Sequence, residues 1–348
     1  NFLVACTLLC IIATGCIAAV DPANIALATA LVVFSYIMFA SGENLISAFL
    51  PEIATPATMG RTSGYGWSIG YVGGLVTLAL CLAYISWAQN QGQAAAESVP
   101  MTLVITAGVM LCASMITFIW LKERAIAAEM ENGRSYVRVG FDRLRQTLSQ
   151  AKRFQDLFRF LVSLTIFQAG ISTVFVVAAI YAQEEMGFST SELVTMIMVV
   201  NVTAAAGAFA VGHVQDRLGS RAALSMGLAI WILALLIIIT AQSRPVVWLG
   251  ANLIGIAMGA CQASARALIG NFTPLARTAE FYGLWGLAVN LAAIIGPLSY
   301  GLISFLSDGN HRLALLSILV YFVFGWLLLL RVNEPRGIAA AMQTADTE

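Results

Sequence analysis

The sequence predicts an all-α integral membrane protein with many membrane-crossing helices. Apolar residues make up 59% of its 348 residues and charged residues only 10%, whereas soluble domains contain about 25% charged residues. Long apolar stretches recur, with lengths near the roughly 20 residues that a helix needs to cross a bilayer. None of them alternates apolar and polar residues as a strand of a transmembrane barrel does.

Ten stretches are predicted to span the membrane: 2–20, 24–48, 65–87, 101–121, 155–182, 191–212, 222–241, 247–270, 280–306 and 313–331. If they alternate in direction, only Arg244 and Arg312 of the 18 Lys and Arg lie on one side. An excess of basic residues in short loops marks the cytoplasmic face. Both termini are therefore predicted to be cytoplasmic.

A basic, polar segment interrupts the spans and divides the chain. The predicted parts are the remainder of an N-terminal bundle (1–121), a cytoplasmic linker (122–154), a six-helix bundle (155–334) and a cytoplasmic tail (335–348). An apolar stripe within the linker leaves two interpretations open, a plain connector or a helix lying on the membrane surface. Its residues are Phe141, Leu144, Leu148 and Phe154.

A short repeat relates the two halves. "TPATMGRTSGYGWSIG" (55–70) and "TPLARTAEFYGLWG" (273–286) each open a span in the same position of their half. Repeated bundles are typical of secondary transporters. In the second half the turn "GHVQDRLGSR" precedes span 222–241, and its counterpart in the first half would end before Asn1. We therefore expect two helices and one turn of a twelve-helix protein to be missing.

The turn Gly212–Arg221, here called the charged turn, is the strongest candidate site. Gly212 and Gly219 allow close helix approach and a tight reversal. The carboxylate of Asp216 can accept from the unpaired N–H groups of a helix start, and the repeat makes the start of span 65–87, after residues 61–63, its expected partner. Arg217 and Arg221 can pair with carboxylates or lipid phosphates. This pattern predicts a cytoplasmic gate between two bundles; the alternative is an ordinary basic loop.

The charged turn resembles the loop motif of the major facilitator superfamily, Gly-x-x-x-Asp-Arg-x-Gly-Arg-Arg, with Ser220 in place of a base. "SAFLPEIATPATMGRTSGYGWSIGYVGG" and "GACQASARALIGNFTP…AEFYGLWG" resemble its Atg22-like branch, which includes bacterial proteins of unassigned substrate and a fungal vacuolar amino-acid effluxer. The resemblance covers residues 1 to about 336. It implies a major facilitator fold of which ten of twelve helices are present, and alternating-access transport of a small organic solute, with amino acids the first class to test.

Polar groups inside the spans are candidates for contact with the substrate or a coupling proton, because they are costly there. They are Glu43, Asn44, Gln168, Asn252, Gln262 and Arg266. Glu43 fits a coupling carboxylate or a hydrogen bond near the interface equally well. Arg266 fits snorkelling or pairing with Glu280 better than substrate binding. The resemblance adds that the first and fourth helices of each half line the cavity, and all six residues lie on such helices.

Two glycine series at four-residue spacing are predicted to pack helices closely. They are Gly66, Gly70 and Gly74, and Gly255 and Gly259. The chain contains no Walker A sequence, nucleophile elbow or metal-ligand spacing, and all six cysteines lie within predicted spans. We expect no enzyme activity, cofactor, metal site or nucleic-acid partner.

The expected surroundings are the lipid bilayer, a small solute and protons for coupling, with the protein acting as a monomer. The bacterial cytoplasmic membrane is the expected location, and the vacuolar membrane is the alternative. The competing hypothesis for function is a transport-inactive membrane scaffold or sensor.

Overall fold

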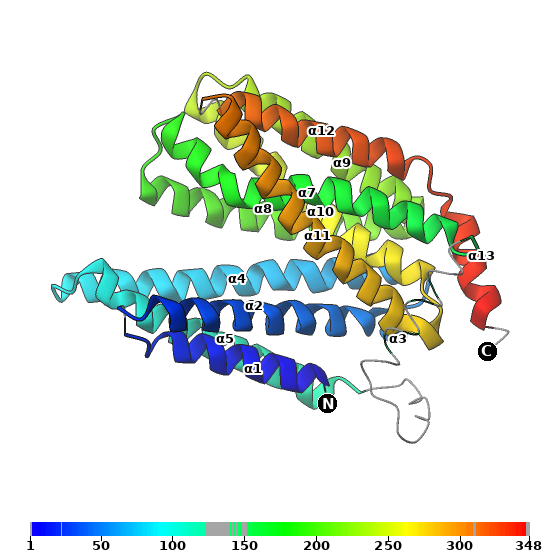
Figure 1. Cartoon of the computed structure of the whole chain (residues 1–348), viewed down its shortest axis with the longest axis horizontal. Coiled ribbons are helices and arrows are strands. Elements are labelled where there is room, and N and C mark those ends of the chain that lie inside the picture. The colour runs from blue at the N-terminus through cyan, green and yellow to red at the C-terminus, as the bar shows by residue number, and fades with distance from the viewer. Residues whose placement is uncertain are drawn as a thin grey trace. The chain divides into compact units, whose positions relative to one another are not determined.

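The computed structural model describes residues 2–21, 23–122, 152–308 and 311–345, with Gly140, Asp142, Arg145 and Thr147 between them. The described residues form helices and turns and no strand (Figure 1), which confirms the all-α prediction. Three residues of the predicted linker stripe, Phe141, Leu144 and Leu148, lie outside the described residues. The helices are α1 (Phe2–Ile17), α2 (Ile25–Ala48), α3 (Leu50–Ile53), α4 (Met59–Asn90), α5 (Ala95–Trp120), α7 (Gln155–Glu184), α8 (Thr190–Leu218), α9 (Ser220–Ile239), α10 (Arg244–Phe272), η1 (Leu275–Arg277), α11 (Thr278–Leu306), α12 (His311–Leu329) and α13 (Glu334–Ala345).

Each predicted span coincides with a helix. Within the described part of the chain, eight helices are long and apolar enough to cross a membrane. α12 passes the same test only together with α13, to which it is joined by a 60° bend. α1 is apolar but has only 16 residues, shorter than the roughly 20 that a bilayer core requires.

The chain divides into two compact units. The first contains Asn1–Phe49 and Gly73–Arg124, and the second contains Leu50–Val72 and Ala125–Glu348. In the first unit α1 packs against α2 and α5, and the hydroxyls of Thr14 and Ser35 lie 2.8 Å apart. The predicted bundle limits at 121 and 155 remain predictions; the first half of α4 belongs to the compact unit formed by the later helices.

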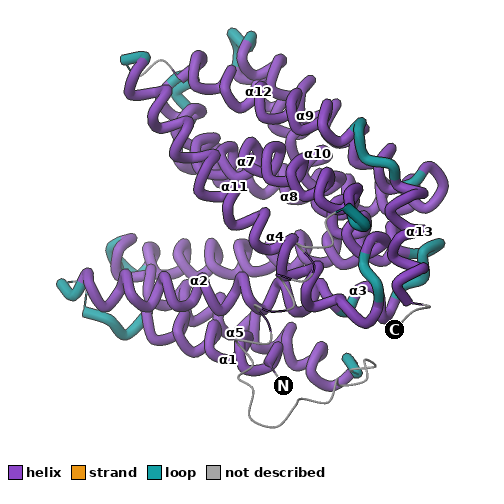
Figure 2. The backbone as a smooth tube through the Cα atoms, turned by 45° about the vertical axis from the view of Figure 1, so that its right-hand side comes forward, coloured by secondary structure: helices purple, strands orange, loops and turns teal. Residues whose placement is uncertain are grey.

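In the second unit α10 packs against α8 and α9, while α7 packs against α11 and α12 (Figure 2). Aromatic rings join α9 to α12 in this unit. Trp231 of α9 is stacked on Phe322 of α12, with 4.8 Å between the ring centroids. Gly255 and Gly259 face α8. A Cβ at Gly259 would clash with the carbonyl oxygen of Ala204, so only glycine permits this helix separation.

A single residue separates α8 from α9. Gly219 has φ +88°, in the region that L side chains rarely adopt. Its N–H donates to the carbonyl of Gln215 at 2.8 Å, which ends α8. The charged turn is therefore a one-residue break between two long helices, with Asp216 in the last turn of α8 and Arg221 in the first turn of α9.

Candidate functional site

Asp216 binds the start of α4. Its carboxylate accepts the N–H of Gly60 at 2.8 Å and the N–H of Arg61 at 3.3 Å, and the Arg61 guanidinium lies 3.7 Å away. α4 has no acidic residue in its own first turn, so Asp216 supplies the anion that a helix N-terminus favours. The side chain of Asp216 is 14% exposed. The predicted contact between Asp216 and the start of this helix is confirmed, but it is made by Gly60 and Arg61 and not by residues after 63. A gating role for Asp216 stays a prediction.

Three glycines bring α4 and α8 into backbone contact around this carboxylate. A Cβ at Gly212 would lie 2.9 Å from the carbonyl oxygen of Gly60, and a Cβ at Gly64 would lie 2.6 Å from that of Ala208. A Cβ at Gly70 would meet no atom of the described residues within 4 Å, and the packing role of Gly70 stays a prediction. Gly66 instead lies under the guanidinium of Arg266. Gly74 lies in the first unit.

Two further side-chain pairs join α4 to this region. The Tyr65 hydroxyl lies 3.1 Å from Nε2 of His213 on α8. Arg266 of α10 donates to the Ser63 hydroxyl at 3.1 Å and to the Ser63 carbonyl at 2.8 Å. Its guanidinium also covers the ring of Trp67 at 5.4 Å. Arg266 therefore contacts the start of α4, an arrangement that the sequence did not predict for it.

The opposite side of the charged turn is held by α13. The Glu334 carboxylate accepts the backbone N–H of Ser220 at 2.8 Å and that of Arg221 at 2.9 Å. It occupies the start of α9 as Asp216 occupies the start of α4. The Arg221 guanidinium donates to the carbonyl of Leu330 at 2.7 Å, while Arg217 is exposed to solvent. The two ends of the turn thus contact two different helices.

Ser220 explains the departure from the superfamily pattern. It is 1% exposed, and its hydroxyl accepts from the side-chain amides of Gln215 at 2.8 Å and Asn271 at 3.1 Å. A long basic side chain at this position would have to enter a buried polar contact between α8 and α10. Serine fits because its small hydroxyl joins these helices.

Of the remaining candidates, two lie in the first unit and three in the second. Glu43 and Asn44 are half-buried on α2 of the first unit. Gln168 and Gln262 are half-buried on α7 and α10. The Asn252 amide donates to the carbonyl of Trp248 on its own helix at 2.8 Å. Glu280, the partner considered for Arg266, accepts from the Thr147 hydroxyl at 2.5 Å.

The second unit also contains an apolar cavity of about 300 Å³ lined by α4, α7, α8, α9, α10 and α12. None of the four polar candidates in the second unit lines it. Among the polar groups of its lining, the Tyr181 hydroxyl donates to the carbonyl of Ile238, and the Asn201 amide donates to the carbonyl of Ile197. None of the described lining residues is charged, so the cavity suits an uncharged group. Sequence reasoning missed it because apolar lining residues resemble any helix core.

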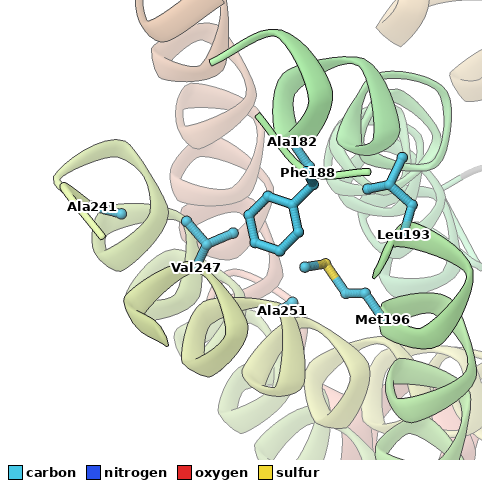
Figure 3. Close-up of a cluster of buried hydrophobic side chains, with 7 residues drawn as sticks. All are labelled: Ala182, Phe188, Leu193, Met196, Ala241, Val247 and Ala251. Carbon is cyan, nitrogen blue, oxygen red and sulfur yellow. The ribbon is translucent and has the colours of Figure 1, made fainter. Parts of the chain in front are cut away.

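A hydrophobic cluster adjoins this cavity. Figure 3 shows the ring of Phe188 between Val247 and Met196. Both of these neighbours also line the cavity. Arg244 fixes the loop that carries Phe188, because its guanidinium lies 5.3 Å over that ring and donates to the carbonyl of Gly187 at 2.6 Å.

Comparison with known proteins places this sequence in a family. The family model described as "Vacuole effluxer Atg22 like" matches residues 57–342. The uncharacterized MFS-type transporter YxiO of Bacillus subtilis is 24% identical over 314 residues, covering 88% of this chain and 71% of the relative. Autophagy-related protein 22 of Yarrowia lipolytica is 24% identical over 93% of this chain. The chain spans 59% of the length of that fungal relative and 48% of its Aspergillus niger counterpart.

Solved structures show the same fold. The human organic anion transporter MFSD10 has a TM-score of 0.70 at 17% identity, covering 93% of this chain and 76% of that protein. The Escherichia coli fucose:proton symporter FucP has a TM-score of 0.65 at 15% identity, covering 95% and 83%. At such identities the likeness concerns the fold alone. The family match covers most of the sequence, and the chain belongs to the vacuole effluxer Atg22-like family of the major facilitator superfamily.

Proposed function

We propose that this protein moves a small organic solute across a membrane by alternating access, with the charged turn and the start of α4 as one gate. The observation that carries the proposal is the Asp216 carboxylate on the N–H groups of Gly60 and Arg61. A carboxylate at a helix N-terminus contributes about 0.3–1 kcal/mol, or up to about 2 kcal/mol when partly buried. Such a contact is strong enough to favour one state and weak enough to break in every cycle.

The comparisons support transport as the general activity, since one relative is named an MFS-type transporter and the matching family model is described as a vacuole effluxer. Amino acids are the first solute class to test, on the resemblance set out from the sequence. The working orientation has both termini in the cytoplasm, and the working location is the bacterial cytoplasmic membrane.

The test is uptake of a labelled amino-acid panel into proteoliposomes that contain the full-length protein, with and without an imposed proton gradient. We expect saturable uptake of at least one amino acid. Uptake that collapses with a protonophore supports proton coupling. Absence of uptake for every amino acid and for a second panel of organic solutes, from correctly folded protein, contradicts the transport proposal and favours a scaffold or sensor.

Glu43 is the proposed coupling group, because it is an ionisable side chain on α2, a helix expected to line the central cavity. The change Glu43→Gln keeps the shape and removes the titratable proton. We expect the variant to lose the pH dependence of uptake while still exchanging labelled for unlabelled solute. A wild-type pH profile in Glu43→Gln would exclude this role and leave transport itself intact.

A further inference from the structure

We propose that the groove between the first two turns of α7 and the end of α12 binds an anionic phospholipid. The groove has a volume of about 450 Å³ and is lined by Gln155, Phe158, Arg159, Val162, Leu328 and Arg331. In this arrangement the lipid phosphate contacts the guanidinium groups of Arg159 and Arg331, and an acyl chain lies along Val162 and Leu328.

The lining changes from polar to apolar along the helix axis. Gln155 begins α7, and Val162 lies seven residues further on, a rise of about 10 Å in an α-helix. Arg159 lies between them, and Arg331 follows the end of α12. Val162 is 53% exposed and lies on a helix apolar enough to cross a membrane, so an acyl chain can reach it. A ligand with a charged head and an apolar tail matches this order of side chains.

Arg159 is oriented by a buried carboxylate. Asp156, 2% exposed, accepts from the Arg336 guanidinium with both oxygens and from the N–H of Asn333 at 3.0 Å. Arg159 lies 3.5 Å from the same carboxylate and keeps a side chain that is 45% exposed. Asp156 thus faces Arg159 and Arg336. Arg159 and Arg331 line the groove, and none of its described lining residues is acidic. A guanidinium offers five N–H donors that fit phosphate oxygens.

A free anion would use only the arginine end of the groove. The apolar end distinguishes a lipid from inorganic phosphate, since only the lipid has a chain to lie on Val162 and Leu328. Basic pockets between membrane helices at one membrane surface are known to hold anionic headgroups. The geometry therefore favours the lipid over the soluble anion.

The experiment measures lipid retention by native mass spectrometry on the full chain, purified in detergent and supplied with phosphatidylglycerol and phosphatidylcholine. Wild type is compared with Arg331→Gln and Arg159→Gln. Each is expected to bind phosphatidylglycerol about fivefold more weakly, the factor that corresponds to about 1 kcal/mol per basic residue at an anionic surface. Arg331→Gln leaves Asp156 untouched and remains informative if Arg159→Gln fails to fold.

Two further variants separate this site from general membrane electrostatics. Val162→Trp fills the apolar end without changing charge and is expected to reduce phosphatidylglycerol binding at least as strongly. Arg145→Gln removes an exposed arginine of the linker and is expected to bind like wild type. Equal losses in Arg145→Gln and Arg331→Gln, or unchanged binding in Val162→Trp, would overturn the proposal. Thermal stabilisation by glycerol phosphate equal to that by phosphatidylglycerol would assign the groove to a soluble anion instead.

Discussion

Asp216 joins two helices through backbone groups. Its oxygens bind the N–H groups of Gly60 and Arg61, which lie among the first four of α4 and have no carbonyl partner within that helix. Arg61 adds an ion pair, but its side chain is half exposed, and exposed ion pairs contribute little. The negative charge at the helix start is therefore the larger part of the interaction.

Asp216→Asn tests this residue. The amide oxygen can still accept a hydrogen bond, but the charge that favours the helix start is lost. Turnover is expected to fall by about twofold to about thirtyfold, the factors that correspond to about 0.3–2 kcal/mol. Initial uptake rates in proteoliposomes give the measurement, with melting temperature followed in parallel. Asp142→Asn, at an exposed position of the linker, is the charge-matched control, and turnover equal to wild type in Asp216→Asn would remove the gate from the mechanism.

At the scale of helices, the crossing of α4 over α8 depends on contact between backbones. The sequence contains two glycine pairs at four-residue spacing in this part of α4, Gly60 with Gly64 and Gly66 with Gly70. Helix rotation decides which pair faces the neighbouring helix, and rotation is set by packing far along the chain. The spacing could therefore predict a close crossing but could not assign it to Gly60 and Gly64.

Gly212→Ala is expected to separate α4 from α8. Its Cβ would lie 2.9 Å from the Gly60 carbonyl oxygen and 3.1 Å from the Gly64 Cα, so backbone has to move, at a cost of about 1–3 kcal/mol. Thermal unfolding in detergent and uptake should both decline. The matched change Gly70→Ala, in open space, should leave the melting temperature within a degree or two of wild type. Equal effects of the two substitutions would contradict the observed crossing.

At the scale of the second unit, α13 holds three other helices. Glu334 binds the start of α9, Arg336 binds Asp156 of α7, and Gly337 lies against the Phe272 ring of α10. The sequence predicted this segment only as a cytoplasmic tail beginning at 335. Glu334 and Ser220 are 114 positions apart, and no local pattern around either residue indicates the other.

Glu334→Gln is expected to lower the stability of the second unit by about 1–2 kcal/mol, because two backbone N–H groups at a helix start lose a charged acceptor. The melting temperature should fall by a few degrees, while the isosteric change Glu185→Gln at an exposed loop position should leave it unchanged. A Glu334→Gln melting temperature equal to that of wild type would show that α13 docks without this carboxylate.

Composition and span length were sufficient to predict a helical membrane protein. The repeat was sufficient to predict that Asp216 contacts the start of α4. The position of Arg266 was harder to predict, because an arginine near a helix end serves snorkelling, ion pairing and helix packing equally well by sequence. Its hydrogen bonds to Ser63 join segments about two hundred positions apart. Such contacts depend on the assembled helices and not on local spacing.

The buried hydroxyl of Ser220 bears on protein engineering. A consensus approach would replace this serine with the arginine that related loops carry, in the hope of a more stable transporter. Here that replacement would remove an acceptor shared by Gln215 and Asn271 and force a cation into the junction of three helices. For this chain the family average is the wrong guide at position 220, and a stabilised version should keep the residue that departs from it.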